Sequence, residues 1–259
     1  MDEAVVTARR GAALWITINR AATRNALTPE VLAGIGDALL RAERDGAIRA
    51  VVLTGAGERA FSAGGALAPP DGDAGFLAVH DQRRAYGLLL QRFAASPLPV
   101  VAAVNGHALA GGMGLVLAAD LAVAAEEAEL GLTEVNLGLF PYQVLALLVR
   151  HLGRKQALEL ALTGRRIVAA EALRLGLVNR IVPRSELEGA AQALAEELAA
   201  KSPAVLALGK RAFYATEDAG LQQAIEHLAG QLSLHLQLDD AMEGVAAFFE
   251  KRKPEWRGR

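Results

Sequence analysis

The sequence predicts an α/β fold in which a layered core of strands and helices is followed by a helical C-terminal region. Strand-like and helix-like segments alternate in the first half of the chain, and from Tyr142 onward the pattern is almost wholly helical. The composition agrees, because 53% of the 259 residues are apolar and 22% are charged, which allows a sizeable core. We therefore expect a core over residues 1–199 and a C-terminal helical region over residues 200–259.

The first half of the chain contains three short apolar runs that are typical of strands buried on both faces. They are Ala50–Thr54, Val100–Val104 and Leu121–Ala125. Before them, the segments Ala4–Ala8 and Ala13–Asn19 predict a hairpin.

Helices are expected between these strands. Thr28 is a good N-cap residue and Pro29 suits the first helical position, so an amphipathic helix should run to about Arg44. Residues 66–75 are rich in proline and glycine and predict a loop, after which a second helix should end near Ala95.

The second half of the chain contains six segments with apolar residues three and four positions apart, the spacing of a helix face. These expected helices are Ala157–Leu162, Ala169–Leu175, Glu186–Ala200, Pro203–Ala215, Leu221–Leu238 and Asp240–Lys251. We expect Val178–Val182 to be the one strand in this part of the chain.

The composition also excludes several classes of function. The absence of cysteine excludes a disulfide scaffold, thiol catalysis and thiolate metal sites. With only five scattered histidines, we expect no metal site of any kind. A net charge of -2 gives no basic excess for a phosphate backbone, so we expect no nucleic-acid partner.

The uncharged run from Leu98 to Ala119 has the length of a membrane span, about 20 residues. Pro99, Asn105 and four glycines interrupt it, so we expect a buried strand, a turn and a short helix, and no membrane partner. The start Met1-Asp2-Glu3 shows no secretory signal, and we expect a cytoplasmic protein.

Two glycine-rich segments each follow a buried strand. They are Phe61–Gly65 and Ala110–Gly114. Glycine at such a place lets a ligand oxygen approach bare backbone N–H groups, and two such segments converging on one point would form an oxyanion hole. Tight packing of strand on helix would also need small residues, and each segment by itself leaves both interpretations open.

One acidic residue stands alone in an apolar stretch. Between Glu129 and Arg150 the only acid is Glu134. Apolar surroundings disfavour the charged form of a carboxylate and raise its pKa toward the range useful for proton transfer. A carboxylate on a surface loop, or at a helix N-terminus, is the alternative interpretation.

Three motifs occur in order: FSAGG at 61–65, NGHALAGGMGLVLAAD at 105–120 and LGLTEVNLGLFP at 130–141. Together they resemble the crotonase superfamily, the enoyl-CoA hydratase/isomerase group. The resemblance extends to NR at 19–20 with RNAL at 24–27, to LTG, AEA and GLV between 162 and 178, and to FFEKRKP at 248–254, so it covers essentially the whole chain. It implies a crotonase-like ββα layered core with a C-terminal oligomerisation region.

The resemblance implies a bound acyl-CoA thioester whose carbonyl oxygen is held by two backbone N–H groups. The matching donors are Gly65 and Gly111. Hydratases of the family use two glutamates twenty residues apart, of which the second matches Glu134 and the first falls on Gly114. The remaining residues implied to lie against the substrate in these turns are Ala63, Gly64, Gly112 and Gly114.

The chain departs from the family at two further places. Ala66 stands where the family has an aspartate, and bulky residues at 140–144 replace a glycine-rich stretch. Tyr142 stands where the family's dehalogenases carry their aspartate, so that chemistry is not expected; Tyr142 lines the acyl pocket or donates a hydrogen bond to the acyl group.

The resemblance implies no cofactor, because coenzyme A is part of the substrate. Arg24 is the expected partner of its phosphates, and Lys251, from this chain or from a neighbouring subunit, is a second candidate. We expect a homotrimer or homohexamer, the common assemblies of the family.

A single carboxylate favours Δ3,Δ2-enoyl-CoA isomerisation, with hydration of 2-enoyl-CoA as a close second. Two alternatives stay open at this point. One is a non-catalytic or weakly active acyl-CoA binder, and the other is a thioester hydrolase or decarboxylase of the same superfamily.

Overall fold

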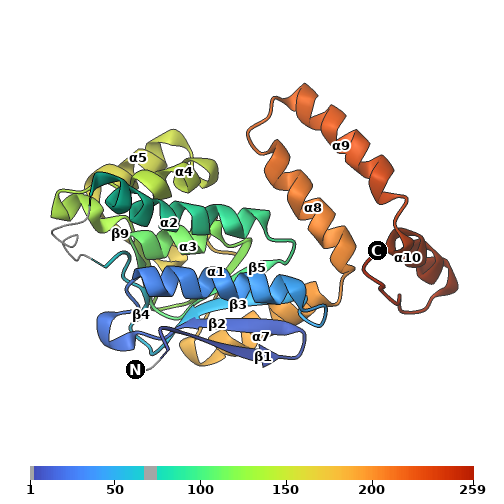
Figure 1. Ribbon diagram of the computed structural model, residues 1–259, viewed down its shortest axis with the longest axis horizontal. Coiled ribbons are helices and arrows are strands. Elements are labelled where there is room, and N and C mark those ends of the chain that lie inside the picture. The colour runs from blue at the N-terminus through green and yellow to red at the C-terminus, as the bar shows by residue number, and fades with distance from the viewer. Residues whose placement is uncertain (1–2, 67–74) are drawn as a thin grey trace.

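The computed structural model describes residues 3–66 and 75–259, and shows an α/β core built around two sheets (Figure 1). The larger sheet has the strand order β1-β2-β3-β5-β7-β10, and its strands run parallel except for β1, which is antiparallel to β2. The bounds of these strands are Val5–Arg10, Ala13–Ile18, Ala50–Gly55, Val100–Val104, Leu121–Ala125 and Arg180–Val182. The expected hairpin and the three expected buried strands are confirmed.

The smaller sheet, in the order β4-β6-β8-β9, consists of three-residue strands. They are Ala60–Ser62, His107–Leu109, Glu129–Gly131 and Arg166–Val168. The expectation of a single late strand is therefore wrong. The second half of the chain contains β9, which pairs antiparallel with β8, as well as β10, which pairs parallel with β7. Three residues are too few to show a periodic pattern, so these strands could not be predicted from the sequence.

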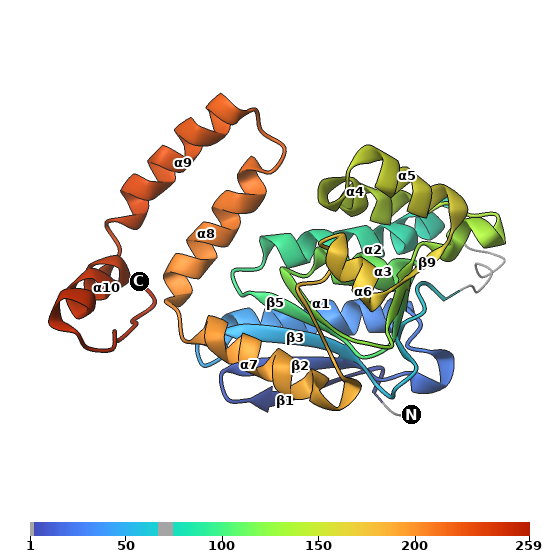
Figure 2. The same cartoon turned by 180° about the vertical axis from the view of Figure 1, so that it is seen from behind.

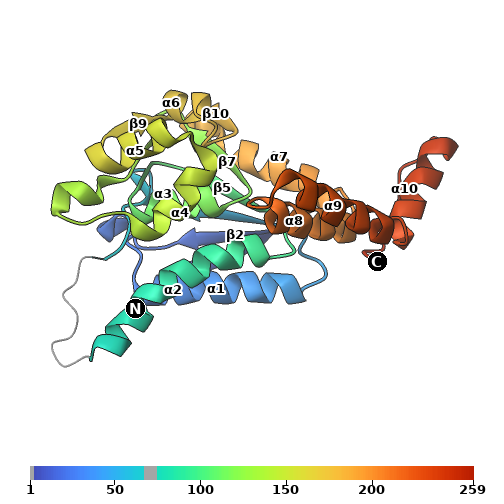
Figure 3. The same cartoon turned by 90° about the horizontal axis from the view of Figure 1, so that it is seen from above.

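Helices cover both faces of the larger sheet (Figure 3). The α-helices α1 to α10 are Pro29–Arg44, Phe76–Ala95, Gly111–Ala118, Tyr142–His151, Arg154–Thr163, Ala169–Arg174, Leu187–Ala199, Pro203–Thr216, Leu221–His235 and Asp239–Glu250. Short 3-10 helices η1, η2 and η3 span Ala21–Thr23, Thr133–Leu137 and Arg184–Glu186. As expected, Thr28 caps α1 by accepting from the Val31 N–H, and Pro29 is its first residue. Residues 67–74 of the expected loop lie outside the described residues.

The central strand β3 is buried on both faces, and its apolar residues therefore do not alternate with polar ones. Val51 and Leu53 pack into one hydrophobic cluster with α1 and α3, whereas Val52 packs into a second cluster on the opposite face with α7. Every other position of β3 therefore faces a different helical layer. Strands buried on both faces read as continuous apolar runs, and this is the reason why β3, β5 and β7 were predictable.

The last three helices leave the core and extend to one side of it (Figures 1 and 2). Helix α8 is fixed to the core by Lys210 and Tyr214, which bind the two carboxylate oxygens of Asp120 at 2.6 and 2.9 Å. Helix α9 buries none of its residues in this chain. The division into residues 1–199 and 200–259 stays a prediction. Within the described residues, no helix is both long and apolar enough to cross a membrane.

Candidate active site

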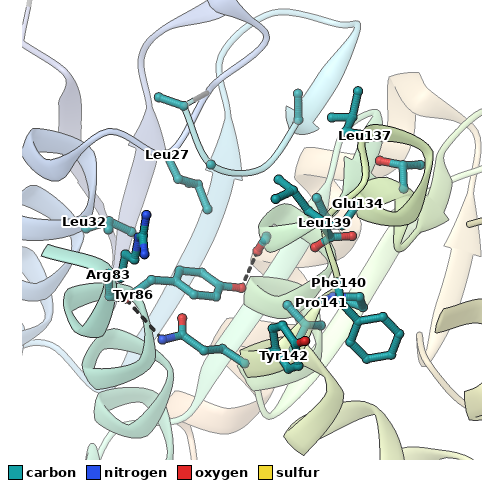
Figure 4. Close-up of a pocket in the computed structure, with 18 residues that line it drawn as sticks. Leu27, Leu32, Arg83, Tyr86, Glu134, Leu137, Leu139, Phe140, Pro141 and Tyr142 are labelled. Carbon is teal, nitrogen blue, oxygen red and sulfur yellow. Dashed lines mark hydrogen bonds between the residues drawn. The ribbon is translucent and has the colours of Figure 1, made fainter. Parts of the chain in front are cut away.

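A cavity of about 430 Å³ opens between α2, the start of α3 and η2 (Figure 4). Most of its lining is apolar, with a few polar groups from η2, α2 and α4. It is lined by Leu27, Leu32, Ala63, Gly65, Ala66, Arg83, Tyr86, Ala110, Gly111, Thr133, Glu134, Leu137, Leu139, Phe140, Pro141, Tyr142, Gln143 and Val144. Apolar cavities with a few converging polar groups are typical of small-molecule sites.

The two glycine-rich segments meet at the back of this cavity, with main chain against main chain. A Cβ atom on Gly64 would lie 2.7 Å from the Ala110 Cβ and 3.0 Å from the Gly111 nitrogen. A Cβ on Gly112 would lie 2.3 Å from the carbonyl oxygen of Ser62. Gly64 also has a φ of 92°, which side chains rarely allow. Tight packing therefore accounts for these two glycines, and it brings the segments together.

Gly65 and Gly111 both line the cavity, and in the described part of the chain neither residue's N–H group donates to another residue. Leu27 pairs with the residues on either side of Gly65. The Leu27 N–H donates to the Gly64 oxygen, and the Leu27 oxygen accepts from the Ala66 N–H. Gly111 is the first residue of α3, so its N–H has no partner within the helix. Two unpaired donors at one cavity can hold an anionic oxygen.

Buried polar side chains hold the FSAGG segment in place. Asn25, which is fully buried, donates to the carbonyl oxygens of Ala56 and Ala60 at 3.0 and 2.7 Å. The Ser62 hydroxyl donates to the Asn25 oxygen at 2.8 Å and accepts from the Gly64 N–H at 3.2 Å. Asn25 belongs to the RNAL motif at 24–27, from which its structural role was not predicted, because its left-handed backbone (φ 56°) leaves no pattern in the sequence.

Glu134 lies on η2 and is the one carboxylate among the described residues that lines the cavity. Its Oε2 atom is buried and has no hydrogen-bond partner within the described residues. Burial raises the pKa of Glu134 above its ordinary value. A half-buried carboxylate with a free oxygen and a raised pKa is suited to accept and return a proton.

The remaining residues named from the sequence are placed differently. Tyr142 lies at the rim of the cavity, packed against Phe140 and 78% exposed. Arg24 does not line the cavity, although its carbonyl accepts from the Ala63 N–H at 2.9 Å. Lys251 ends α10, which lies on the side of the molecule away from the cavity (Figure 1).

Gly64, Gly112 and Gly114 lie behind the lining and do not form part of it. Their effect on the site is therefore through packing. Ala63 does line the cavity, next to Gly65.

Two residues of α2 line the cavity and were not named from the sequence. The Tyr86 hydroxyl donates to the Gly111 carbonyl oxygen at 2.7 Å, and Arg83 lies one turn before it (Figure 4). Their spacing of three residues places them on one helix face. That spacing is common in helices, so it could not have identified them as cavity residues.

Comparisons with known proteins agree over the whole chain. A family model described as enoyl-CoA hydratase/isomerase matches residues 9–259. A putative enoyl-CoA hydratase of Thermus thermophilus is 42% identical over 97% of this chain and 100% of that protein. A carnitinyl-CoA dehydratase of Salmonella paratyphi A is 36% identical over 100% of both chains.

Solved structures show the same fold. The crystal structure of an enoyl-CoA hydratase from Mycobacterium smegmatis has a TM-score of 0.93 and 33% identity, over 98% of this chain and 99% of that one. An enoyl-CoA hydratase from Bacillus anthracis has a TM-score of 0.92 and 34% identity, over 99% and 100% of the two chains. The α/β crotonase-like fold expected from the motifs is confirmed.

Proposed function

Because the chain belongs to the enoyl-CoA hydratase/isomerase family of the crotonase superfamily, we propose that it isomerises an enoyl-CoA thioester. In this proposal Glu134 moves one proton between C2 and C4 of the acyl group. The N–H groups of Gly65 and Gly111 hold the thioester oxygen. Coenzyme A belongs to the substrate, and the reaction requires no other cofactor.

The observation that carries the proposal is that Glu134 is the one carboxylate lining the cavity among the residues that the structure describes. The position twenty residues earlier, where hydratases of the family have their first glutamate, is Gly114. A proton shuttle requires one acid–base group, whereas addition of water also requires a group that holds and deprotonates the water.

The proposed cycle begins with the Glu134 carboxylate removing a proton from C2 of a 3-enoyl thioester. The electron pair left at C2 conjugates with the C3–C4 double bond and the carbonyl group. The resulting dienolate carries negative charge on the thioester oxygen, where the N–H groups of Gly65 and Gly111 stabilise it. Protonated Glu134 then gives the proton to C4, which leaves the double bond between C2 and C3 and restores the carboxylate.

The raised pKa of Glu134 supports both halves of this cycle. A carboxylate stabilised by ion pairs would be too weak a base to remove a C2 proton. The apolar lining, which includes Leu137 and Leu139, makes the charged form less stable and so makes Glu134 a stronger base.

Hydration of 2-enoyl-CoA is the second candidate. The observation that favours it is the naming of relatives as a putative enoyl-CoA hydratase and a carnitinyl-CoA dehydratase. With Glu134 alone we expect hydration to be slower than isomerisation, because one general acid–base group contributes about 10²–10⁴-fold and the second is missing.

The test is turnover of 3-enoyl-CoA and 2-enoyl-CoA by the purified protein and by Glu134→Gln. We expect faster conversion of the 3-enoyl substrate, and a loss of about 10²–10⁴-fold in the variant. Glu126→Gln is the matched control, because Glu126 is exposed and lies outside the cavity. Full activity of Glu134→Gln would remove Glu134 from the mechanism, and tight acyl-CoA binding without any turnover would support a non-catalytic binder.

We further propose that the chain forms a homotrimer or homohexamer through α8–α10. Apolar side chains on these helices are largely exposed in the single chain, among them Leu221, Phe248 and Phe249 at 77–78%. In such an assembly, Lys251 of a neighbouring copy would join Arg24 near the coenzyme A phosphates. Size-exclusion chromatography with light scattering tests this proposal, and a clean monomer would contradict it.

A further inference from the structure

Tyr86 and Gly114 occupy the same small space. A Cβ atom built on Gly114 would lie 2.0 Å from the Tyr86 hydroxyl oxygen and 2.9 Å from a methyl carbon of Val144. A non-bonded carbon and oxygen cannot lie 2.0 Å apart, so a Cβ at position 114 would force the Tyr86 hydroxyl to move. A side chain at position 114 and the observed position of Tyr86 therefore exclude each other.

Several contacts fix the Tyr86 side chain in this space. Its hydroxyl donates to the Gly111 carbonyl oxygen at 2.7 Å, and its ring lies over the Gly111 α-carbon, where a Cβ would be 3.4 Å from the ring carbon Cζ. Figure 4 shows the side chain extending from α2 across the cavity toward α3. The ring would have to swing away from α3 to free the space beside Gly114.

The hydroxyl of Tyr86 remains protonated. Burial and the nearby negative charge of Glu134 both raise the pKa of Tyr86 above its ordinary value. Its proton is used in the hydrogen bond to Gly111. Tyr86 therefore supplies neither a base nor a negative charge where hydratases of the family have their first glutamate.

We propose that Tyr86 determines the reaction by occupying, with a neutral hydroxyl, the place beside Gly114 from which the side chain of a second carboxylate would extend. This inference rests on the proposed function, in which Glu134 acts alone. Addition of water to C3 needs an ordered water with a base beside it, and with Tyr86 in this place no such base extends from position 114. Transfer of a proton from C2 to C4 needs no such water, so it is left as the favoured reaction.

The first experiment compares Tyr86→Phe with the unchanged protein, measuring hydration and isomerisation with the same pair of enoyl-CoA substrates. Removal of the hydroxyl leaves room for a water that takes its place on the Gly111 oxygen, near Glu134. We expect the ratio of hydration to isomerisation to rise by at least about tenfold. A merely structural defect would lower both rates and leave the ratio unchanged.

Tyr214→Phe is the matched control. The Tyr214 hydroxyl is also hydrogen-bonded, to Asp120 at 2.9 Å, but it lies on α8 and outside the cavity. Loss of the Tyr214 hydroxyl should leave the ratio of hydration to isomerisation within about twofold of the ratio in the unchanged protein. An equal rise of the ratio in both variants would contradict a specific effect of Tyr86.

The second experiment restores the carboxylate. Gly114→Glu alone should be destabilised by the clashes with Tyr86 and Val144, whereas Tyr86→Ala combined with Gly114→Glu should recover the part of the thermal stability that is lost to Tyr86, and gain hydration. Failure of Tyr86→Ala to relieve Gly114→Glu would contradict mutual exclusion of the two side chains.

A crystal structure of Tyr86→Phe gives a readout that does not depend on turnover. An ordered water bonded to the Gly111 oxygen is expected, and its absence, or an unchanged ratio of rates in the folded variant, would overturn the role of Tyr86. Failure of the proposed function differs from this result. It would be seen in the unchanged protein, as an inability to convert 3-enoyl-CoA.

Discussion

The two walls of the cavity present different chemical groups. The main-chain wall consists of the two glycine-rich segments, in which Gly65 and Gly111 line the cavity and their N–H groups have no partner among the described residues. The side-chain wall consists of Tyr86 and Glu134, which reach the cavity from α2 and η2. The two segments of the main-chain wall pack directly against each other, so a substitution there disturbs the fold. We expect the side chains of the opposite wall to be replaceable without a change of fold. In the proposed mechanism, the main-chain wall stabilises the charge on the thioester oxygen, and the side-chain wall determines which reaction follows.

The strongest test of this difference is Gly112→Ala. The added Cβ would lie 2.3 Å from the Ser62 oxygen, so the two segments would have to separate. We expect a loss of at least about 1–3 kcal/mol in the free energy of unfolding and loss of turnover. Thermal unfolding and 3-enoyl-CoA kinetics measure the two effects.

Gly189→Ala on α7 is the control, since nothing lies within 4 Å of the added Cβ. It should keep full activity and gain up to about 1 kcal/mol in stability, because alanine favours a helix more than glycine. A stable and active Gly112→Ala protein would mean that the main-chain wall is not tied to packing.

On the side-chain wall, the ionisation of Glu134 should affect activity and stability in opposite directions. Its pKa is raised by burial, so activity should fall with decreasing pH at a value above the ordinary 4.5. The sign for stability is opposite to that of an ion-paired carboxylate. The folded chain holds the proton more tightly than the unfolded chain, so ionisation lowers stability as pH rises from 4.5 through the raised pKa.

Glu134→Gln removes the loss of stability that ionisation of the buried carboxylate causes. Its melting temperature should match that of the unchanged protein below pH 4.5 and exceed it at neutral pH. Thermal unfolding from about pH 4 to about pH 8 is the measurement, because this range begins near the ordinary pKa of glutamate and extends past neutral pH. A variant that is less stable at every pH would show that the side-chain wall is also structural.

A smaller effect is expected from Ser62→Ala, behind the main-chain wall. The fully buried Ser62 hydroxyl links the Asn25 oxygen to the Gly64 N–H. Its removal should cost about 1–3 kcal/mol, because these groups lose their partner, and a small shift of Gly65 should lower kcat by about tenfold. Ser233→Ala, an exposed serine of α9, is the control. An unchanged kcat in a destabilised Ser62→Ala protein would separate the position of the donors from the packing behind them.

The sequence allowed prediction of the elements that carry long or continuous apolar patterns. Strands β3, β5 and β7 were found because both faces are buried, and α1 was found through Thr28 and Pro29. The strands of the smaller sheet were missed because three residues hold no readable period.

For the site, the motifs pointed to Gly65, Gly111 and Glu134, and all three line one cavity. Tyr86 was not predictable, since it comes 25 residues before Gly111 and meets it only because α2 packs across α3. The direction of one side chain across a helix pair depends on tertiary packing, which the local sequence does not contain.

The 2.0 Å overlap between Tyr86 and a Cβ at Gly114 also constrains the order in which this site can evolve. We expect a lineage that gains a glutamate at position 114 while Tyr86 is in place to pass through a destabilised intermediate, in which the Tyr86 side chain is displaced. A lineage that first replaces Tyr86 keeps a folded protein at every step. Replacement of Tyr86 is therefore expected to come before a glutamate at position 114. Sequences related to this chain should include some with a small residue at position 86 and glycine at position 114, but none with tyrosine at position 86 and glutamate at position 114.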